Sequence, residues 1–484
     1  MSADAAAVPH FPVLRAGKEY SSLDRVELTS HRDGAVVASV SQANAGLVRR
    51  DMRKLDANAA RLRAMPIAER IERCKEAARI FLEDELPIGD GFTQTADDYV
   101  AQLSSTSGLP HVMVRANMEK CAFVLAEMPT ILRGLMRGMD PSVLDEGFGD
   151  HDGVPVWYTP SARALGAVLP SNSPGVHSLW IPAIALGVPL ALKPGREEPW
   201  TPMRVARAMM AAGFPAEAFS LYPTDHEGAG TLLECCDRSL LFGDARVAEK
   251  YAGDPRIEIH GPGRSKVLVG EDVADDWEQF LDVYVESVAR NGGRSCINAS
   301  AIYIPRHGEA LAEALAARLA EIEPRPHDDP EAGIAAFANP AFADMMSGAI
   351  DAGIEKGGAR DVTMAARGGS ARRAELGCSV YLRPTVVRCD SMEHPLANTE
   401  YMFPFTSVVE VPQERMLEVM GHSLVVTALT RDPAFLQDLT TSPLISRLNV
   451  GPVPTSKVEW DQPHEGNLFE FLYERRALQR AAGW

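Results

Sequence analysis

The sequence lacks features that several protein classes require. No CxxC pair occurs among its seven cysteines, which excludes zinc ribbons and thioredoxin-like redox motifs. No apolar run reaches the length of about 18 residues that a transmembrane helix needs. Positive charge is also scarce, because 48 lysines and arginines stand against 66 aspartates and glutamates, a net charge of −18. This deficit argues against a nucleic-acid partner and against an anionic membrane surface, since both require a basic face.

Other absences concern the compartment and metals. The beginning of the chain has no basic segment followed by an apolar one, so we expect no signal peptide. A modest, odd number of cysteines favours a reducing compartment, and we therefore predict a cytoplasmic protein. No metal site is expected, because the pairs His226-Glu227 and His464-Glu465 lack the second histidine of a helical zinc motif. With 484 residues, 46% of them hydrophobic, the chain can form a large core in two or three domains.

Residues 163–242 alternate short apolar strands with helical stretches. Strands are expected at Leu165–Leu169, Pro189–Leu192, Phe219–Tyr222 and Ser239–Phe242, with helices at Val176–Leu186, Pro202–Ala212 and Gly228–Cys235. Later strands are expected at Val267–Val269, Ala299–Ile304, Tyr381–Val387, Thr406–Val411 and Leu424–Leu429. Such alternation predicts an α/β fold whose parallel sheets are covered by helices on both faces. The tail Phe469–Gln479 fits a helix or an edge strand equally well.

The most informative segment is Asn291-Gly292-Gly293-Arg294-Ser295-Cys296-Ile297-Asn298. A helix ends there, two glycines release the backbone, and a single cysteine follows an arginine. Backbone NH groups in such a turn and a nearby cation can lower the pKa of a thiol, and glycine lets a substrate approach the backbone. Free cysteines are more often small buried hydrophobes, so this segment alone does not distinguish a nucleophile from a structural residue.

Two other segments place polar groups at strand ends. Asn172, in Pro170-Ser171-Asn172-Ser173-Pro174-Gly175, could donate its amide to a developing oxyanion or could form an Asx turn. Lys193 follows a buried strand, at the edge where open α/β sheets bind ligands. A solvated loop lysine is the alternative.

Five segments share their order with the motifs of one enzyme family. They read PSNSPGVHSLWIPAIALGVPLALKPG from Pro170, LLFGD from Leu240, IEIHGPGRSK from Ile257, NGGRSCINAS from Asn291 and LANTEYMFPF from Leu396. From about Pro160 to Gly466 the chain resembles the aldehyde dehydrogenase superfamily. The resemblance implies three catalytic residues, namely Cys296 as nucleophile, Glu258 as general base and Asn172 as oxyanion donor. It implies cofactor contacts from Pro170, Ser171, Lys193, Arg196, Gly243 and Glu400.

The fold implied by this resemblance has two Rossmann-type parallel-sheet domains and a small bridging hairpin. The cofactor-binding domain would comprise residues 1–145 and 160–260, and the catalytic domain residues 261–460. Segments 146–159 and 466–484 would bridge subunits. Because the family pairs subunits through such a hairpin, a homodimer or homotetramer is expected.

The implied activity is the NAD(P)-dependent oxidation of an aldehyde to a carboxylic acid through a thiohemiacetal and a thioester on Cys296. In the alternative, CoA replaces water, and the protein is a CoA-acylating dehydrogenase or acyl-CoA reductase. A third hypothesis is a non-catalytic binding module on the same fold. The aldehyde would lie in a tunnel lined by His177, Trp180, Trp460 and His464.

Three positions refine these expectations. Arg196 stands where many NAD-preferring relatives have a glutamate, which favours NADP, although Glu197 or Glu198 could contact the ribose instead. Asp244 replaces the serine of the family's Gly-Ser pair and would bring a carboxylate close to a pyrophosphate. Glu258 precedes Cys296 by 296 − 258 = 38 residues, a slightly long separation for the family.

Overall fold

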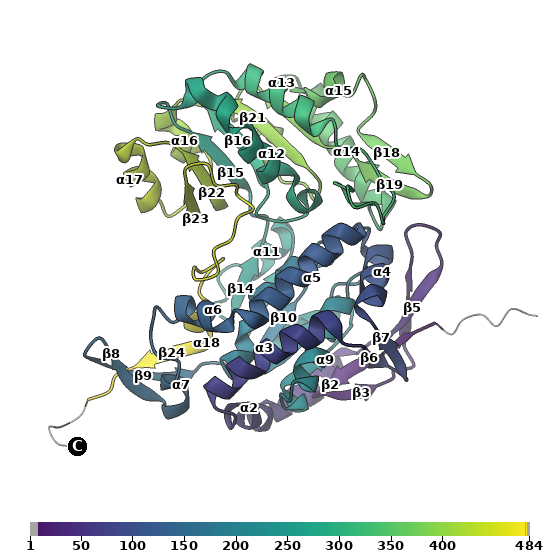
Figure 1. The fold of residues 1–484 in the computed structure, drawn as a ribbon, viewed down its shortest axis with the longest axis vertical. Helices are drawn as coiled ribbons and strands as arrows, with labels where there is room; N and C mark the ends of the chain where they lie inside the picture. Colours follow the sequence, from purple (N-terminus) through teal and green to yellow (C-terminus); the bar gives the residue numbers. More distant parts are fainter. Residues whose placement is uncertain (1–7, 480, 482–484) are drawn as a thin grey trace, which may run out of the picture.

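The computed structural model describes residues 8–479 and 481, and these residues form two lobes with a seven-stranded sheet each (Figure 1). The lower sheet has the order β14-β13-β10-β11-β12-β2-β3, and the upper sheet the order β17-β20-β21-β16-β15-β22-β23. Strands β10 to β14 are parallel, as are all strands of the upper sheet except β17. The fold is therefore α/β with two largely parallel sheets, as predicted.

The strands of these two sheets follow the chain in order. The lower sheet contains β2 (Val13–Arg15), β3 (Lys18–Tyr20), β10 (Leu165–Val168), β11 (Leu190–Lys193), β12 (Phe219–Leu221), β13 (Arg238–Phe242) and β14 (Ile257–His260). The upper sheet contains β15 (Ser265–Val269), β16 (Ala299–Ile304), β17 (Ala359–Asp361), β20 (Thr385–Cys389), β21 (Phe405–Glu410), β22 (Ser423–Leu429) and β23 (Ile445–Val450). Smaller pieces are β1 (His10–Phe11), β4 (Arg25–Thr29), β5 (Val36–Ser41), β6 (Leu86–Gly89) and β7 (Phe92–Gln94).

Helices cover both faces of each sheet. In the lower lobe they are α1 (Ala45–Asp51), α2 (Leu55–Arg63), α3 (Ile67–Glu83), α4 (Ala96–Ser107), α5 (His111–Ala126), α6 (Met128–Leu135), α8 (Pro182–Ala185), α9 (Trp200–Ala211), α10 (His226–Cys235) and α11 (Ala245–Tyr251). In the upper lobe they are α12 (Leu281–Ala289), α13 (Gly308–Leu319), α14 (Pro340–Glu355), α15 (Thr363–Ala366), α16 (Gln413–Val419) and α17 (Pro433–Thr441). Within the described part of the chain, no helix combines the length and apolarity needed to span a membrane.

The strand interiors show why both faces need helices. Side chains alternate along a strand, and in β15 Val267 and Val269 pack into one core while Leu268 packs into another. The first core includes α12 and α13, and the second includes α14, α16 and α17. A strand that is apolar at every position is thus buried on both sides, as the parallel-sheet pattern requires.

A third sheet projects from the lower lobe (Figure 1). It has the order β24-β9-β8 and joins β8 (Phe148–His151) and β9 (Val154–Pro160) to β24 (Tyr473–Arg476), near the end of the chain. The tail is both of its expected alternatives in turn, because α18 (Leu468–Leu472) precedes β24. The role of this sheet in a dimer or tetramer stays a prediction. Residues 1–7, 480 and 482–484 of the expected segments lie outside the described residues.

Proline accounts for two expected elements that are absent from these described segments. The predicted helix Val176–Leu186 is instead a 3-10 turn, Pro174–Leu179, followed by α8, because Pro182 has no NH to continue a helix. The predicted strand Tyr381–Val387 is divided by Pro384 into β19 (Ser379–Leu382) and β20. These two strands belong to different sheets, since β19 pairs with β18 (Arg373–Leu376).

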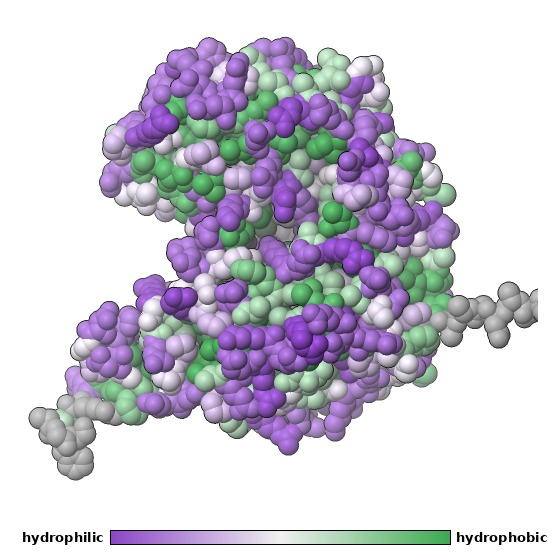
Figure 2. Space-filling view, viewed as in Figure 1, coloured by the Kyte–Doolittle hydropathy of each residue, from purple (hydrophilic) through white to green (hydrophobic). Residues whose placement is uncertain are grey.

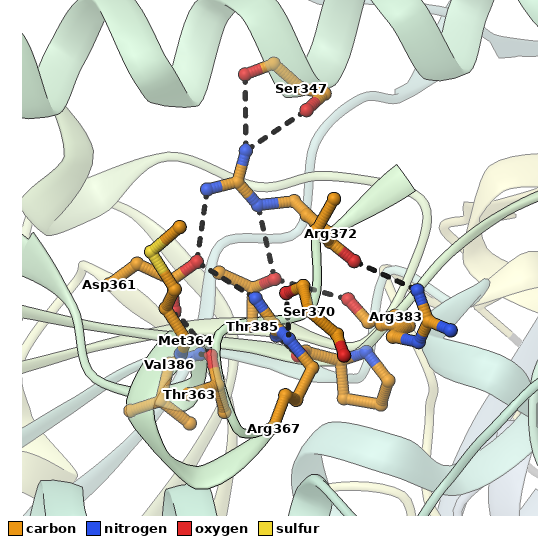
Figure 3. A network of polar contacts seen from close by, with 12 residues as sticks. Ser347, Asp361, Thr363, Met364, Arg367, Ser370, Arg372, Arg383, Thr385 and Val386 are labelled. Carbon is orange, nitrogen blue, oxygen red and sulfur yellow. Dashed lines mark hydrogen bonds and ion pairs between the residues drawn. The ribbon is translucent and has the colours of Figure 1, made fainter. Parts of the chain in front are cut away.

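A buried polar network holds the edge of the upper sheet to α14 and α15 (Figure 3). Asp361, at the end of β17, accepts hydrogen bonds of 3.1 Å from both Arg367 and Arg372. Arg372 also donates to the hydroxyls of Thr385 in β20 and Ser347 in α14, at 3.2 and 3.0 Å. Because the three charged side chains are at most 8% exposed, each depends on the others for compensation of its charge.

Candidate active site

A cavity of about 460 Å³ lies between the two lobes and has Cys296 in its wall. Its walls come from α5, the turn after β10, the turn around Cys296 and the segment that precedes α18. In the space-filling view the surface is hollowed between the lobes (Figure 2). The residues that line the cavity and matter below are Lys120, Ser173, Gly175, Ser295, Cys296, Trp460, His464 and Glu465.

The turn that carries Cys296 is shaped by left-handed backbone. Asn291, Gly292 and Gly293 have φ values of 55°, 63° and 68°. A Cβ at Gly293 would lie 2.3 Å from the backbone of Phe403, so this position requires glycine. The two glycines identified in the sequence thus bend the chain after α12 and place Cys296 at the cavity.

Side-chain amides hold this turn in place. Asn298 accepts from the backbone NH of Ser295 at 2.9 Å and donates to the carbonyl of Ser287 at 3.1 Å. Asn291 accepts from the amide of Asn117 in α5 at 2.8 Å and donates to the hydroxyl of Ser173 at 3.0 Å. Asn117, which the sequence did not single out, therefore ties α5 to both turns that meet at the cavity.

The electrostatic environment of Cys296 differs from the expected one. Arg294 is buried and donates to the carbonyls of Ser107 and Ala336, so its guanidinium serves the backbone and not the thiol. Burial, with the nearby carboxylates of Glu465 and Glu400, raises the pKa of the Cys296 thiol, and Lys120 opposes this rise. The resting thiol is therefore protonated and needs a proton acceptor before it can attack.

Asn172 lies directly beside the cysteine turn. Its amide nitrogen donates to the carbonyl of Arg294 at 2.8 Å, and Met402 sulfur is 3.8 Å away. The amide thus bridges the turn after β10 and the turn two residues before Cys296. Its function as oxyanion donor stays a prediction.

Glu258 lines a neighbouring cavity of about 70 Å³ and not the one that contains Cys296. It is followed by His260, whose Nε2 lies 3.5 Å from the Glu258 carboxylate and whose Nδ1 lies 2.5 Å from Glu465. Glu465 lines both cavities, so it stands between Glu258 and Cys296. The sequence had offered Glu465 only as part of a rejected zinc motif, because its 169-residue distance (465 − 296) from the cysteine hides their proximity.

This carboxylate–histidine cluster has shifted pKa values. Burial raises the pKa of Glu258 to about 7, with His260 lowering it and Glu465 raising it. Burial disfavours the charged form of His260, but the hydrogen bond and charge of Glu465, together with Glu258, outweigh this effect and raise its pKa. Because the three groups interact, they titrate as one unit.

The expected cofactor residues Pro170, Ser171 and Lys193 lie together at the carboxyl edge of β10 and β11. Val168 pairs with Lys193, and the loop after β11 packs so closely that a Cβ at Gly195 would lie 2.3 Å from the Ser171 hydroxyl. Such a close approach of backbone segments is a suitable cradle for a nucleotide.

The loop after Lys193 separates the three residues that could contact the ribose. Arg196 is exposed, and no ion pair of the described residues includes it. Glu198 is 1% exposed and accepts from Thr201, with the His177 ring at 2.7 Å. Glu198 is therefore committed to the interior, which leaves Arg196 and Glu197 as the two candidates.

Gly243 and Asp244 end β13. The backbone NH of Gly243 donates to the carbonyl of His260 at 3.2 Å. The Asp244 carboxylate turns to the start of α11 and accepts from the NH groups of Val247 and Arg246 at 3.0 Å each, which lowers its pKa. The carboxylate thus occupies the helix start that a pyrophosphate would use, and a cofactor would have to bind at the β10–β11 edge instead.

Glu400 lies on the other side of the cysteine turn. One carboxylate oxygen accepts from the NH of Arg264 at 2.6 Å, next to Gly263, whose backbone contacts the carbonyl of Cys296. Its other oxygen is buried without a partner in the described part of the chain. Burial raises the pKa of Glu400 to about 7. The unpaired oxygen can accept a hydrogen bond from a ligand hydroxyl, as the implied ribose contact requires.

Two of the four residues expected to line the substrate tunnel do not line it. His177 and Trp180 are fully buried, with the Trp180 indole donating to His177 at 3.0 Å. They point inward because the expected helix is a 3-10 turn, whose other face, with Ser178, lines the cavity. Trp460 and His464 do line it.

The described residues contain no group of three or more His, Cys, Asp or Glu side chains that could hold a metal ion.

Among curated proteins, the chain is similar to an aminoacetaldehyde dehydrogenase of Pseudomonas aeruginosa, with 29% identity over 50% of this chain and 49% of that protein. It is 24% identical to an N-succinylglutamate 5-semialdehyde dehydrogenase of Vibrio cholerae over 66% of this chain and 63% of that protein. The matched part of the chain therefore spans only about half to two thirds of the length of these relatives.

Solved structures extend the likeness to nearly the whole fold. An indole-3-acetaldehyde dehydrogenase in complex with NAD+ matches with a TM-score of 0.80 and 16% identity over 97% of this chain and 96% of that one. The aldehyde dehydrogenase KauB from Pseudomonas aeruginosa matches with a TM-score of 0.79 and 17% identity over the same shares. The family model described as the aldehyde dehydrogenase family matches residues 18–420, which is most of the sequence. The chain belongs to the aldehyde dehydrogenase family.

Proposed function

We propose that the protein oxidises an aldehyde to a carboxylic acid with a nicotinamide cofactor, using Cys296 as nucleophile. The observation that supports this most strongly is the place of Cys296 in the wall of the cavity between the lobes, on a turn that only glycine permits. The other six cysteines, Cys74, Cys121, Cys235, Cys236, Cys378 and Cys389, do not line this cavity.

The first step forms a bond between the sulfur of Cys296 and the aldehyde carbon. The thiol gives up its proton, and the electron pair of the carbonyl moves to its oxygen to give a thiohemiacetal. The backbone NH of Cys296 and the amide of Asn172 would stabilise the negative oxygen. A bound nicotinamide supplies the hydride acceptor that turns this adduct into a thioester. The unpaired oxygen of Glu400 and the cradle at Ser171 and Gly195 suit such a cofactor.

Release of the acid requires water and a base. We assign the base to Glu258 and place Glu465 and His260 between it and the cavity that contains Cys296. Because Glu258 has a pKa of about 7 and must be ionised to accept a proton, thioester hydrolysis should slow as the pH falls below about 7. We expect Glu258→Gln to lower the hydrolysis rate by about 10²-fold or more and to remove this pH step, while thioester formation persists.

The measurement is single-turnover hydrolysis of the acyl-enzyme as a function of pH, with Glu465→Gln compared directly. If Glu465→Gln removes the pH step and Glu258→Gln leaves it, Glu465 is the base and Glu258 is only a buried neighbour.

The position of Glu258 outside the cavity of Cys296 also favours a second candidate function, in which CoA and not water receives the acyl group. The product separates the two, because hydrolysis yields the free acid and transfer yields acyl-CoA. A protein that binds no nicotinamide cofactor, measured by quenching of its tryptophan fluorescence, would instead support the non-catalytic binding module.

We propose NADP as the preferred cofactor, bound through Arg196. An exposed guanidinium without an ion pair can accept a 2′-phosphate with two parallel hydrogen bonds. We expect Arg196→Ala to lower kcat/KM for NADP by roughly ten- to a hundredfold and to change kcat/KM for NAD little. Glu197→Gln is the matched variant. If it raises the use of NADP while Arg196→Ala changes nothing, Glu197 reads the ribose and NAD is preferred.

A further inference from the structure

Lys120 is a cation inside the cavity that has no counter-ion of its own. It extends from α5, lines the same cavity as Cys296, and is partly buried. Its ammonium lies 5.7 Å from the centre of the Trp460 ring, and a Cβ at Gly175 would lie 3.4 Å from it, so the absence of a side chain at Gly175 leaves room for this group. None of the ion pairs found in residues 8–479 includes Lys120.

The charges around Lys120 do not neutralise it. Arg447 in β23 donates to Nδ1 of His464 at 2.6 Å, and no ion pair of the described residues includes Arg447 either. His464 is neutral, because burial and the charges of Arg447 and Lys120 hold its pKa well below the usual value. Of the nearby carboxylates, Glu465 is already paired with His260. Glu119 and Glu286, which also line the cavity, are exposed to solvent.

A partly buried cation without a partner is costly, since water is replaced by groups that cannot compensate its charge. Burial accordingly lowers the pKa of Lys120. A ligand with anionic oxygens would remove this cost, because it would supply the missing counter-ion within the cavity. The indole of Trp460 contacts the cation but cannot replace a counter-ion.

We propose that the cavity binds an aldehyde that carries an anionic group, a carboxylate or a phosphate, and that Lys120 pairs with this group while Cys296 receives the aldehyde. Arg447, held behind His464, adds positive potential to the same wall. This inference rests on the proposed function, and it names the substrate class of that site. It makes Lys120 a specificity-determining residue, distinct from the groups that carry out the reaction.

Substrate pairs that differ mainly in charge test the proposal. Succinic semialdehyde is compared with its uncharged methyl ester, and glyceraldehyde 3-phosphate with glyceraldehyde. The two anionic compounds distinguish a carboxylate from a phosphate. We expect kcat/KM of the wild type to be higher for one anionic member than for its neutral counterpart. Lys120→Met should lower kcat/KM for that substrate by roughly ten- to a hundredfold, while the neutral counterpart changes less than about threefold.

Two further variants sharpen the test. Lys120→Arg keeps the charge and should recover part of the preference. Lys75→Met removes a lysine that is exposed on the neighbouring helix α3, and it should leave both substrates unaffected. A thermal melt of each variant checks that it is folded.

The inference is overturned if Lys120→Met lowers kcat/KM equally for charged and neutral aldehydes, since Lys120 would then act on the thiol of Cys296. It is also overturned if the wild type prefers neither anionic substrate. Calorimetric titration with succinate gives a readout that does not need activity. If no aldehyde is oxidised, the proposed function fails, but succinate or glycerol 3-phosphate bound at least tenfold more weakly by Lys120→Met would still support an anion site. Equal binding by both proteins, or none, would contradict it.

Discussion

Cys296→Ala should bind the nicotinamide cofactor like the wild type and oxidise no aldehyde. Without the sulfur no thiohemiacetal can form, and no other cysteine lines the cavity to replace it. We expect kcat to fall by about 10³-fold or more, because loss of a covalent nucleophile removes the whole route. Steady-state assays measure this loss, and fluorescence titration with the cofactor shows whether binding is retained.

The matched control is Cys378→Ala, which removes an exposed cysteine of the upper lobe. Its activity should equal that of the wild type. A Cys296→Ala variant that keeps activity near the wild-type level would contradict the assignment of the nucleophile and with it the proposed reaction.

Asp361→Ala should lower the free energy of unfolding by about 3–5 kcal/mol. The carboxylate joins Arg367 and Arg372, whose side chains are 1% and 5% exposed (Figure 3). Removing it leaves two buried guanidinium groups with less compensation for their charge, which costs far more than the loss of one favourable contact. Urea denaturation followed by circular dichroism measures the change.

Asp344→Ala provides the comparison, because Asp344 forms an ion pair of 2.7 Å with Arg373 in the same lobe but is 57% exposed. An exposed pair contributes about 1 kcal/mol or less, so this variant should stay close to the wild type. Similar small losses in both variants would show that the buried network does not stabilise the upper lobe.

The catalytic residues could be predicted only as far as local motifs reach. The two glycines before Cys296 and the position of Lys193 after an apolar strand are local patterns, and the structure places both residues where such patterns suggest. Glu465 and Lys120 could not be found in this way. They lie 465 − 296 = 169 residues after and 296 − 120 = 176 residues before the cysteine, and only the packing of the two lobes brings them to the same cavity.

The sequence by itself determined the alternation of strands and helices, the α/β class and the family resemblance, because apolar periodicity and turn residues act over a few positions. Only the tertiary structure decided which way individual side chains point. It buried His177 and Trp180, paired Glu198 with the interior, turned Asp244 onto its own helix and placed Glu258 behind Glu465. These outcomes depend on contacts between distant segments, and a pattern that gives the period of an element does not say which neighbour its faces meet.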